Sequence, residues 1–193
     1  MKIGVLALQG AFAEHEKVLE QLGAECIELR QVRDLAEPYD ALVLPGGEST
    51  VQGKLLKELG MFDIMKSQIE NGMPVLATCA GAILLAETIN GQMKGQPEQY
   101  FGTIPMCIKR NAYGRQLGSF HTEAPVAGIG TVPMTFIRAP YIASVGNGVE
   151  VLAVVEERIV GVKYKNQMAF SFHPELDPDM RIHKTFLSMI SNV

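Results

Sequence analysis

The chain has 193 residues, of which 47% are hydrophobic and 20% are charged, and its formal net charge at pH 7 is −4. A chain of this length and composition is expected to form one globular domain, residues 1–193, with a substantial core. Because acidic residues outnumber basic ones and no basic run occurs, nucleic acid and anionic membranes are not expected as partners.

The three cysteines, Cys26, Cys79 and Cys107, show no metal-ligand spacing, so no metal site is expected. An odd number of thiols fits a reducing cytoplasm better than an oxidising compartment. No apolar stretch is long enough to span a bilayer. These features predict a cytoplasmic domain without a transmembrane anchor.

The first half of the chain alternates short apolar runs with amphipathic segments, which predicts a parallel sheet with helices on both faces. Strands are expected at residues 3–8, 26–29, 41–44 and 75–78, and helices at 12–22, 49–59, 62–70 and 80–89. In such a fold the ligand lies at the carboxyl ends of the strands. Gln9, Gly46–Gly47 and Cys79 are all expected at that edge.

The second half changes character after a polar, Gly-containing segment at 90–98, which is expected to be a mobile loop. Between residues 100 and 172, short strand-like pieces separated by Gly and Asn turns predict antiparallel hairpins. A closing helix is expected at 178–190. The predicted fold class is α/β, a flavodoxin-like three-layer fold with a mostly parallel central sheet and added antiparallel hairpins.

Cys79 stands between a buried strand-like run, residues 75–78, and a helix-like run that begins with Ala80-Gly81. A strand that turns sharply into a helix at small residues exposes the corner side chain, and the helix N-terminus behind it favours a thiolate. This pattern is a nucleophile elbow with sulfur in place of the serine oxygen. Ala77 stands where the elbow usually has Gly. A buried structural thiol is the alternative interpretation.

A nucleophilic cysteine needs a base, and His173 is the best candidate because it ends an apolar strand and precedes Pro174-Glu175. On an extended chain, residues two apart face the same side, so the Glu175 carboxylate can reach the imidazole. In this triad His173 deprotonates Cys79 and Glu175 fixes the tautomer. An accidental acidic neighbour is the alternative. The other histidines are expected on the first helix, exposed or at an interface (His15), in a hairpin (His121) and on the last helix (His183).

The turn Pro45-Gly46-Gly47-Glu48-Ser49-Thr50 can direct an amide N–H into the crevice, because glycine adopts backbone conformations that other residues avoid. Gly46 or Gly47, together with the N–H of Ala80, forms a candidate oxyanion hole. Ser49 is expected to cap the following helix. A phosphate-binding loop is disfavoured because no Gly-Lys-Ser/Thr follows, whereas a plain strand-to-helix turn remains an alternative.

Six segments together carry a family resemblance: Leu8–Ala11, Leu44–Thr50, Thr78–Gly81, Arg110–Gln116, Phe136–Arg138 and Ser171–Leu176. They resemble the glutaminase subunit of pyridoxal 5′-phosphate synthase, a class I glutamine amidotransferase. Cys, His and Glu with a Gly-Gly turn mark only the class, and the segment at 110–116 with Gly-Glu-Ser-Thr narrows it to this family. The sequence departs from the family pattern at Ala77 and at Val51-Gln52.

The resemblance implies hydrolysis of L-glutamine to L-glutamate and ammonia through a thioester on Cys79, with His173 and Glu175 completing the triad and with no cofactor. By position it implies substrate contacts from residues of the turn and of two later segments, namely Gly47, Glu48, Ser49, Arg110, Ile137 and Arg138. An arginine suits the α-carboxylate of glutamine because its planar fork binds in a bidentate manner.

The partner that the resemblance implies is a synthase subunit, a (β/α)₈ barrel that receives the ammonia through a tunnel and forms a core decorated by glutaminase subunits. His15, Gln9 and the first helix are the candidates for the docking side. Two alternatives remain: the glutaminase subunit of another amidotransferase, such as imidazole glycerol-phosphate synthase, or a non-catalytic regulatory subunit that kept the fold.

Overall fold

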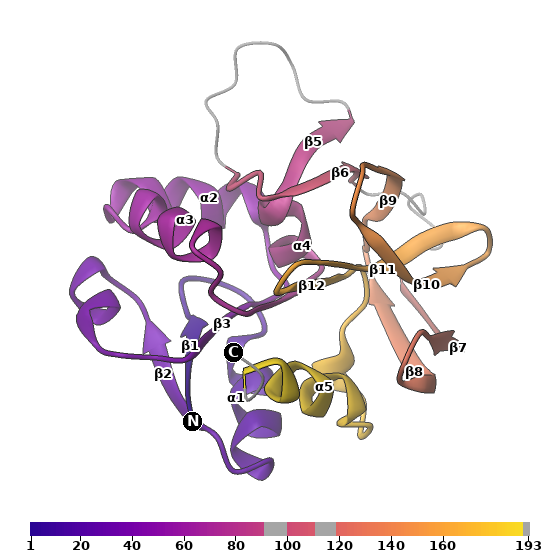
Figure 1. The fold of residues 1–193 in the computed structure, drawn as a ribbon, viewed down its shortest axis with the longest axis horizontal. Coiled ribbons are helices and arrows are strands. Elements are labelled where there is room, and N and C mark those ends of the chain that lie inside the picture. Colours follow the sequence, from indigo (N-terminus) through magenta and orange to yellow (C-terminus); the bar gives the residue numbers. More distant parts are fainter. Residues whose placement is uncertain (91–99, 111–118, 191–193) are drawn as a thin grey trace.

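The structure is a computed structural model that describes residues 1–90, 100–110 and 119–190. Most of its strands form one sheet: β1 (Lys2–Leu6), β2 (Glu25–Leu29), β3 (Ala41–Leu44), β4 (Val75–Thr78), β5 (Ala86–Asn90), β6 (Ile104–Lys109), β9 (Tyr141–Val145), β10 (Glu150–Val155), β11 (Arg158–Tyr164) and β12 (Gln167–Phe170). The strand order is β2-β1-β3-β4-β12-β11-β9-β6-β5, with β10 paired to β11 (Figure 1).

Helices cover both faces of this sheet (Figure 1). They are α1 (Phe12–Gln21), α2 (Ser49–Glu58), α3 (Phe62–Glu70), α4 (Ala80–Leu85) and α5 (Arg181–Ile190), with the 3₁₀ turns η1 (Val32–Ala36) and η2 (Pro174–Leu176). Strand β3 shows how the sequence produces the layers, because successive side chains of a strand point to opposite faces. Leu42 and Leu44 join the core beneath α2 to α4. Ala41 and Val43 join the core that contains α1 and α5.

The parallel half of the sheet consists of β2, β1, β3, β4 and β12, and it contains the strands predicted from the first half of the sequence. From β12 onward the pairing of β11 with β12, β9 and β10 is antiparallel. A separate hairpin, β7 (Ser119–Val126) with β8 (Gly130–Ile137), packs on the core of α1 and α5 through Met134 and Phe136. The predicted α/β class with added antiparallel hairpins is therefore confirmed.

One predicted element is wrong. The helix expected at 80–89 ends at Leu85, and residues 86–90 form β5, which pairs in parallel with β6. The Leu84 carbonyl accepts the Phe101 N–H at 2.7 Å, so a bond to a distant segment ends the helix. Tertiary pairing has overridden the helical propensity of an Ala- and Leu-rich run. The loop expected at 90–98 lies almost wholly outside the described residues.

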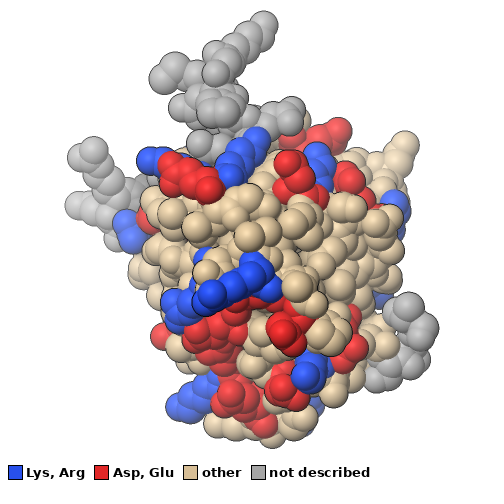
Figure 2. Space-filling model, turned by 90° about the vertical axis from the view of Figure 1, so that its left-hand side faces the viewer, with Lys and Arg blue, Asp and Glu red and all other residues tan. Residues whose placement is uncertain are grey.

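Acidic and basic side chains lie next to one another on the face beside β2 and α3 (Figure 2). Some of these charges pair across neighbouring positions, as Arg30 Nε does with Glu28 Oε2 at 2.5 Å. Among the described residues, no helix is long and apolar enough to cross a membrane.

Candidate active site

Cys79 occupies a sharp corner between β4 and α4. Its backbone has φ 47° and ψ −102°, a strained conformation for a residue other than glycine. The corner is fixed from behind because the Cys79 N–H donates to the Phe170 carbonyl of β12 at 2.8 Å. A Cβ at Gly81 would lie 1.9 Å from the Leu44 carbonyl oxygen, so only glycine fits there. The predicted elbow is present, and it accommodates Ala77 in a fully buried strand position.

His173 and Glu175 form a buried pair beside this corner. His173 Nδ1 lies 2.7 Å from Glu175 Oε1, and the Glu175 side chain is fully buried. The two side chains meet as expected, but their geometry is not that of an extended chain. Pro174–Leu176 is the 3₁₀ turn η2, which turns the carboxylate back towards the imidazole. His173 N–H also donates to the Thr135 carbonyl at 2.8 Å, so strand β8 holds the base in place.

The electrostatics of the pair favour a charged imidazole next to a carboxylate. Burial lowers the pKa of His173, but a hydrogen bond with Cys79 and the adjacent Glu175 carboxylate outweigh burial and raise that pKa above its ordinary value. Burial also raises the pKa of Glu175, and the neighbouring His15 and His173 rings reverse that effect and lower it. The arrangement can therefore hold a proton on His173 at neutral pH.

A cavity of about 270 Å³ opens in front of Cys79 and His173. Its walls contain every residue that the family resemblance assigned to substrate: Gly47, Glu48, Ser49, Arg110, Ile137 and Arg138. Gln9 and Gly46 line it as well, as the strand-end argument predicts. Residues separated by more than a hundred positions in the sequence thus line one concave pocket into which several polar groups converge, a feature of small-molecule sites.

The Gly-Gly turn is packed tightly against His173 and Cys79. A Cβ at Gly46 would lie 2.3 Å from His173 Cε1, so a side chain there would displace the imidazole. The Gly46 N–H donates to Thr78 Oγ1 at 3.1 Å, and the Glu48 N–H donates to Gln9 Oε1 at 2.7 Å. Of the candidate oxyanion donors, the Gly46 N–H is therefore already used within the protein.

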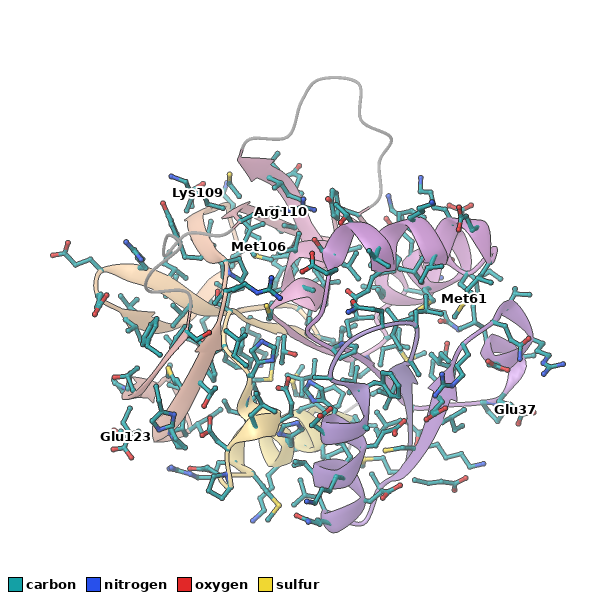
Figure 3. All side chains as sticks on the ribbon, turned by 180° about the vertical axis from the view of Figure 1, so that it is seen from behind. Glu37, Met61, Met106, Lys109, Arg110 and Glu123 are labelled. Carbon is teal, nitrogen blue, oxygen red and sulfur yellow. The ribbon has the colours of Figure 1, made fainter. Side chains whose placement is uncertain are left out.

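Arg110 closes the side of the cavity next to α2 (Figure 3). Its guanidinium Nη2 donates to Ser49 Oγ at 2.9 Å and contacts the Tyr100 hydroxyl, and its Cζ lies 5.4 Å from the centre of the Tyr100 ring. The prediction that Ser49 caps α2 is wrong, because Ser49 is the first residue of the helix and Glu48 occupies the N-cap position. Residues 111–116 of the family motif lie outside the described residues.

Arg138 and Glu48 form the outer rim of the cavity. Arg138 Nη2 lies 3.9 Å from Glu48 Oε1, and the two side chains are 77% and 59% exposed. An ion pair that exposed contributes little to stability. Both groups are therefore available to a ligand at little cost.

His15 is not where the sequence analysis expected it. It is 0% exposed rather than on an outer face, so it cannot be part of a docking surface. Its Nε2 lies 3.0 Å from Thr78 Oγ1 and 3.3 Å from Glu175 Oε2, and its Nδ1 lies 3.0 Å from His183 Nε2. The flanking Glu14 and Glu16 suggested exposure, and only the apolar period of α1, with Val18 and Leu19 buried on the same side, indicates otherwise.

Gln52 is a second residue whose place the sequence did not indicate. It is 0% exposed, and its Nε2 donates to the Gln9 carbonyl at 2.8 Å and to the Pro45 carbonyl at 3.3 Å. It thereby joins the loop after β1 to the turn after β3. The departure from the family pattern at this position lies in the support of the turn rather than in the cavity wall.

Comparisons with known proteins show the family to which the chain belongs. The model of the SNO glutamine amidotransferase family matches residues 5–192. The chain belongs to this family. It is 60% identical over 192 residues to the pyridoxal 5′-phosphate synthase subunit PdxT of Desulfitobacterium hafniense strain Y51, covering 100% of this chain and 94% of the relative. It is 54% identical to the subunit of the same name from Streptococcus pneumoniae strain D39, covering 98% and 97%.

The fold agrees as well. A solved structure described as a glutamine amidotransferase superposes with a TM-score of 0.91 at 43% identity and covers 98% of each chain. The resemblance inferred from the six sequence segments is thereby confirmed along nearly the whole chain. The chain is a glutamine amidotransferase subunit of the family to which the pyridoxal 5′-phosphate synthase glutaminases belong.

Proposed function

We propose that this chain hydrolyses L-glutamine to L-glutamate and ammonia at Cys79. In this proposal His173 is the general acid and base, and Glu175 orients His173 and stabilises its protonated form. The observation that carries the proposal is the 2.7 Å contact of His173 Nδ1 with a fully buried carboxylate, directly beside a strained cysteine corner. A structural thiol needs neither feature.

The chemistry follows from this geometry. The Cys79 sulfur attacks the side-chain carboxamide carbon, and His173, protonated by the thiol, gives that proton to the departing ammonia. The remaining γ-glutamyl thioester is attacked by water, which His173 deprotonates, and glutamate leaves as the thiol is restored. Because the Gly46 N–H is held by Thr78, we assign the oxyanion hole to the N–H groups of Gly47 and Ala80.

The outer cavity supplies the groups that glutamine requires. Arg110 presents a guanidinium that is fixed by Ser49 and Tyr100, which suits the α-carboxylate. Glu48 and Arg138 form a rim of both charges near the α-amino and α-carboxylate groups of the substrate. Gly47 and Ile137 complete the wall. The bound amino acid would thus be recognised by its charged end while its carboxamide reaches Cys79.

We propose that the partner of this chain is a synthase subunit that uses the ammonia to make pyridoxal 5′-phosphate, and the relatives, which are named pyridoxal 5′-phosphate synthase subunits, support this. In this proposal the synthase is a (β/α)₈ barrel core that carries glutaminase subunits, and the ammonia passes to it without release. All three cysteines are thiols, which supports a reducing cytoplasmic setting.

The test is glutamate release from L-glutamine by the chain alone and with the synthase subunit, for wild type and Cys79→Ala. The proposal expects release that depends on Cys79 and rises when the synthase is added. A wild-type complex that assembles but releases no glutamate would instead support a non-catalytic subunit. A rate of glutamate release that does not change when the synthase is added would indicate a different amidotransferase partner.

A further inference from the structure

Two buried polar side chains, His15 of α1 and Thr78 of β4, lie between the triad and the Gly46–Gly47 turn. Both are 0% exposed, and the mechanism above gives neither a role. Burying an imidazole and a hydroxyl is costly unless both are hydrogen-bonded. Their partners are therefore informative.

The contacts of Thr78 Oγ1 connect the two halves of the site. It accepts the Gly46 N–H at 3.1 Å on one side and lies 3.0 Å from His15 Nε2 on the other. The same His15 nitrogen lies 3.3 Å from Glu175 Oε2, which is within ion-pair distance, and this buried carboxylate oxygen has no hydrogen-bond partner among the described residues. A continuous polar path thus runs from the triad carboxylate to the turn.

The histidine pair determines which way the protons point. His183 Nε2 lies 3.0 Å from His15 Nδ1, and His183 Nδ1 is buried without a hydrogen-bond partner in the described part of the chain. If His183 carries its proton on Nε2, that N–H donates to His15 Nδ1. His183 Nδ1 then has no proton, so no buried N–H lacks an acceptor. His15 then carries its proton on Nε2, which donates to Thr78 Oγ1 and lies 3.3 Å from Glu175 Oε2. The opposite tautomers would bury a free N–H and set a lone pair against a carboxylate.

We propose that His15 and Thr78 are positioning residues of the glutaminase site. The His15 N–H lies against the Glu175 carboxylate at 3.3 Å and stabilises its charge, and the Thr78 hydroxyl accepts the Gly46 N–H, so that the triad and the oxyanion turn keep a fixed mutual geometry. This inference rests on the proposed function of the same site. According to this inference, the two side chains lie outside the cavity and affect kcat without affecting the binding of glutamine.

A purely structural role makes a different prediction. Loss of either group would then lower stability and leave the rate per folded molecule and its pH dependence unchanged. A positioning role lowers kcat with KM nearly unchanged, because neither side chain lines the cavity. Loss of His15 should also alter the pH dependence of the reaction rate, because titratable groups face it. These groups are Glu175, His173, His183 from α5 and Glu14 on its own helix.

The first experiment compares Thr78→Val, which removes the hydroxyl at nearly constant shape, with Thr78→Ser, which keeps it. Glutamate release is measured in the complex with the synthase subunit, per folded molecule. We expect Thr78→Val to lower kcat by roughly 10- to 100-fold, the usual cost of a misplaced reacting group. The kcat of Thr78→Ser should remain within about threefold of wild type, because the hydroxyl is kept. Equal kcat in wild type and Thr78→Val, or equal losses in both variants, would overturn the inference.

The second experiment does not depend on turnover. The rate of Cys79 alkylation by iodoacetamide is followed against pH by peptide mass spectrometry, which separates Cys79 from Cys26 and Cys107. For His15→Leu we expect the acid limb to move to higher pH by about one unit, since the variant loses a polar contact at 3.3 Å with the charged Glu175 carboxylate. His15→Gln, which retains an N–H donor, should restore most of the profile. If His15→Leu fails to fold, Thr78→Val and His15→Gln still provide the test.

These measurements separate the two proposals. A wild-type complex that releases no glutamate, combined with a shifted alkylation profile in the variants, would refute the glutaminase function and support the positioning role. Cys79-dependent release with identical alkylation profiles in wild type, Thr78→Val and His15→Leu would refute only the positioning role.

Discussion

Replacing Glu175 by Gln isolates the charge of the triad carboxylate. The amide has nearly the same shape, and its oxygen can still accept a hydrogen bond from His173 Nδ1. The negative charge is lost, and with it the main partner of a protonated His173. Because Glu175 does not line the cavity, glutamine binding should be unaffected.

The size of the effect follows from the contact. With His173 Nδ1 and Glu175 Oε1 2.7 Å apart, the two charge centres are roughly 4 Å apart. At an effective dielectric constant of about 20, unit charges at that distance attract by about 4 kcal/mol. Since about 1.4 kcal/mol corresponds to a tenfold change in rate, the ceiling is about a thousandfold. The amide recovers part of this, so we expect kcat to fall by about 100- to 1000-fold with KM nearly unchanged.

The assay is glutamate release by the complex with the synthase subunit, with the folded fraction checked by thermal unfolding. Glu37→Gln is the matched control, because it removes the same charge at an exposed position far from the cavity (Figure 3). A kcat for Glu175→Gln within about threefold of wild type, where the Coulomb estimate requires far more, would refute the assignment of Glu175 to the triad.

Three further predictions concern substrate binding, the elbow and acid stability. Arg110→Lys should raise KM for glutamine by about 10- to 100-fold with a smaller change in kcat, because an ammonium cannot replace the bidentate fork; an unchanged KM would contradict the carboxylate role. Gly81→Ala should lower the free energy of unfolding in urea by about 3 kcal/mol or more, because its Cβ meets a backbone carbonyl at 1.9 Å. Gly60→Ala, where φ is +69° and nothing lies within 4 Å, should cost only about 1 kcal/mol. Burial lowers the pKa of His183 to about 3, so at pH 5 its protonation in the unfolded state favours unfolding by about 2 kcal/mol. His183→Gln should remove that part of the stability loss between pH 7 and 5, whereas the exposed control His121→Gln should not.

The sequence predicted those parts of the site that depend on local pattern. Cys79 stands at a corner because a short apolar strand meets small residues, and the carboxyl ends of β1, β3 and β4 meet because the sheet is parallel there. The substrate residues came from the family resemblance, and all of them line one cavity with Cys79. Their individual roles in binding remain predictions.

What the sequence did not predict depends on contacts between distant segments. Residues 86–89 were expected to continue the Ala- and Leu-rich helix that begins at residue 80, but residues 86–90 pair with β6, and no local signal reveals that partner. His15 lies between two glutamates and looks exposed, yet α5 and η2 cover it. Ser49 looks like a cap in the sequence, but it is the first residue of α2, and its hydroxyl accepts a hydrogen bond from Arg110, 61 positions away. In each case a tertiary partner replaced the local one.

The buried histidines also connect the geometry of the site to the pH range of the fold. Burial lowers the pKa values of His15 and His183. As pH falls below the ordinary histidine range, these two residues therefore bind protons in the unfolded chain but not in the native one, which lowers the stability of the fold. The pKa of Glu175 is lowered as well, so its stabilisation is present above its ordinary value and is lost as pH falls through the lowered one. His173 acts in the opposite direction, because its raised pKa gives stabilisation that is lost only as pH rises through that raised value. The fold is therefore most stable where Glu175 is ionised, His173 is protonated and the other two rings are neutral. That is the protonation state which the proposed thiol chemistry requires.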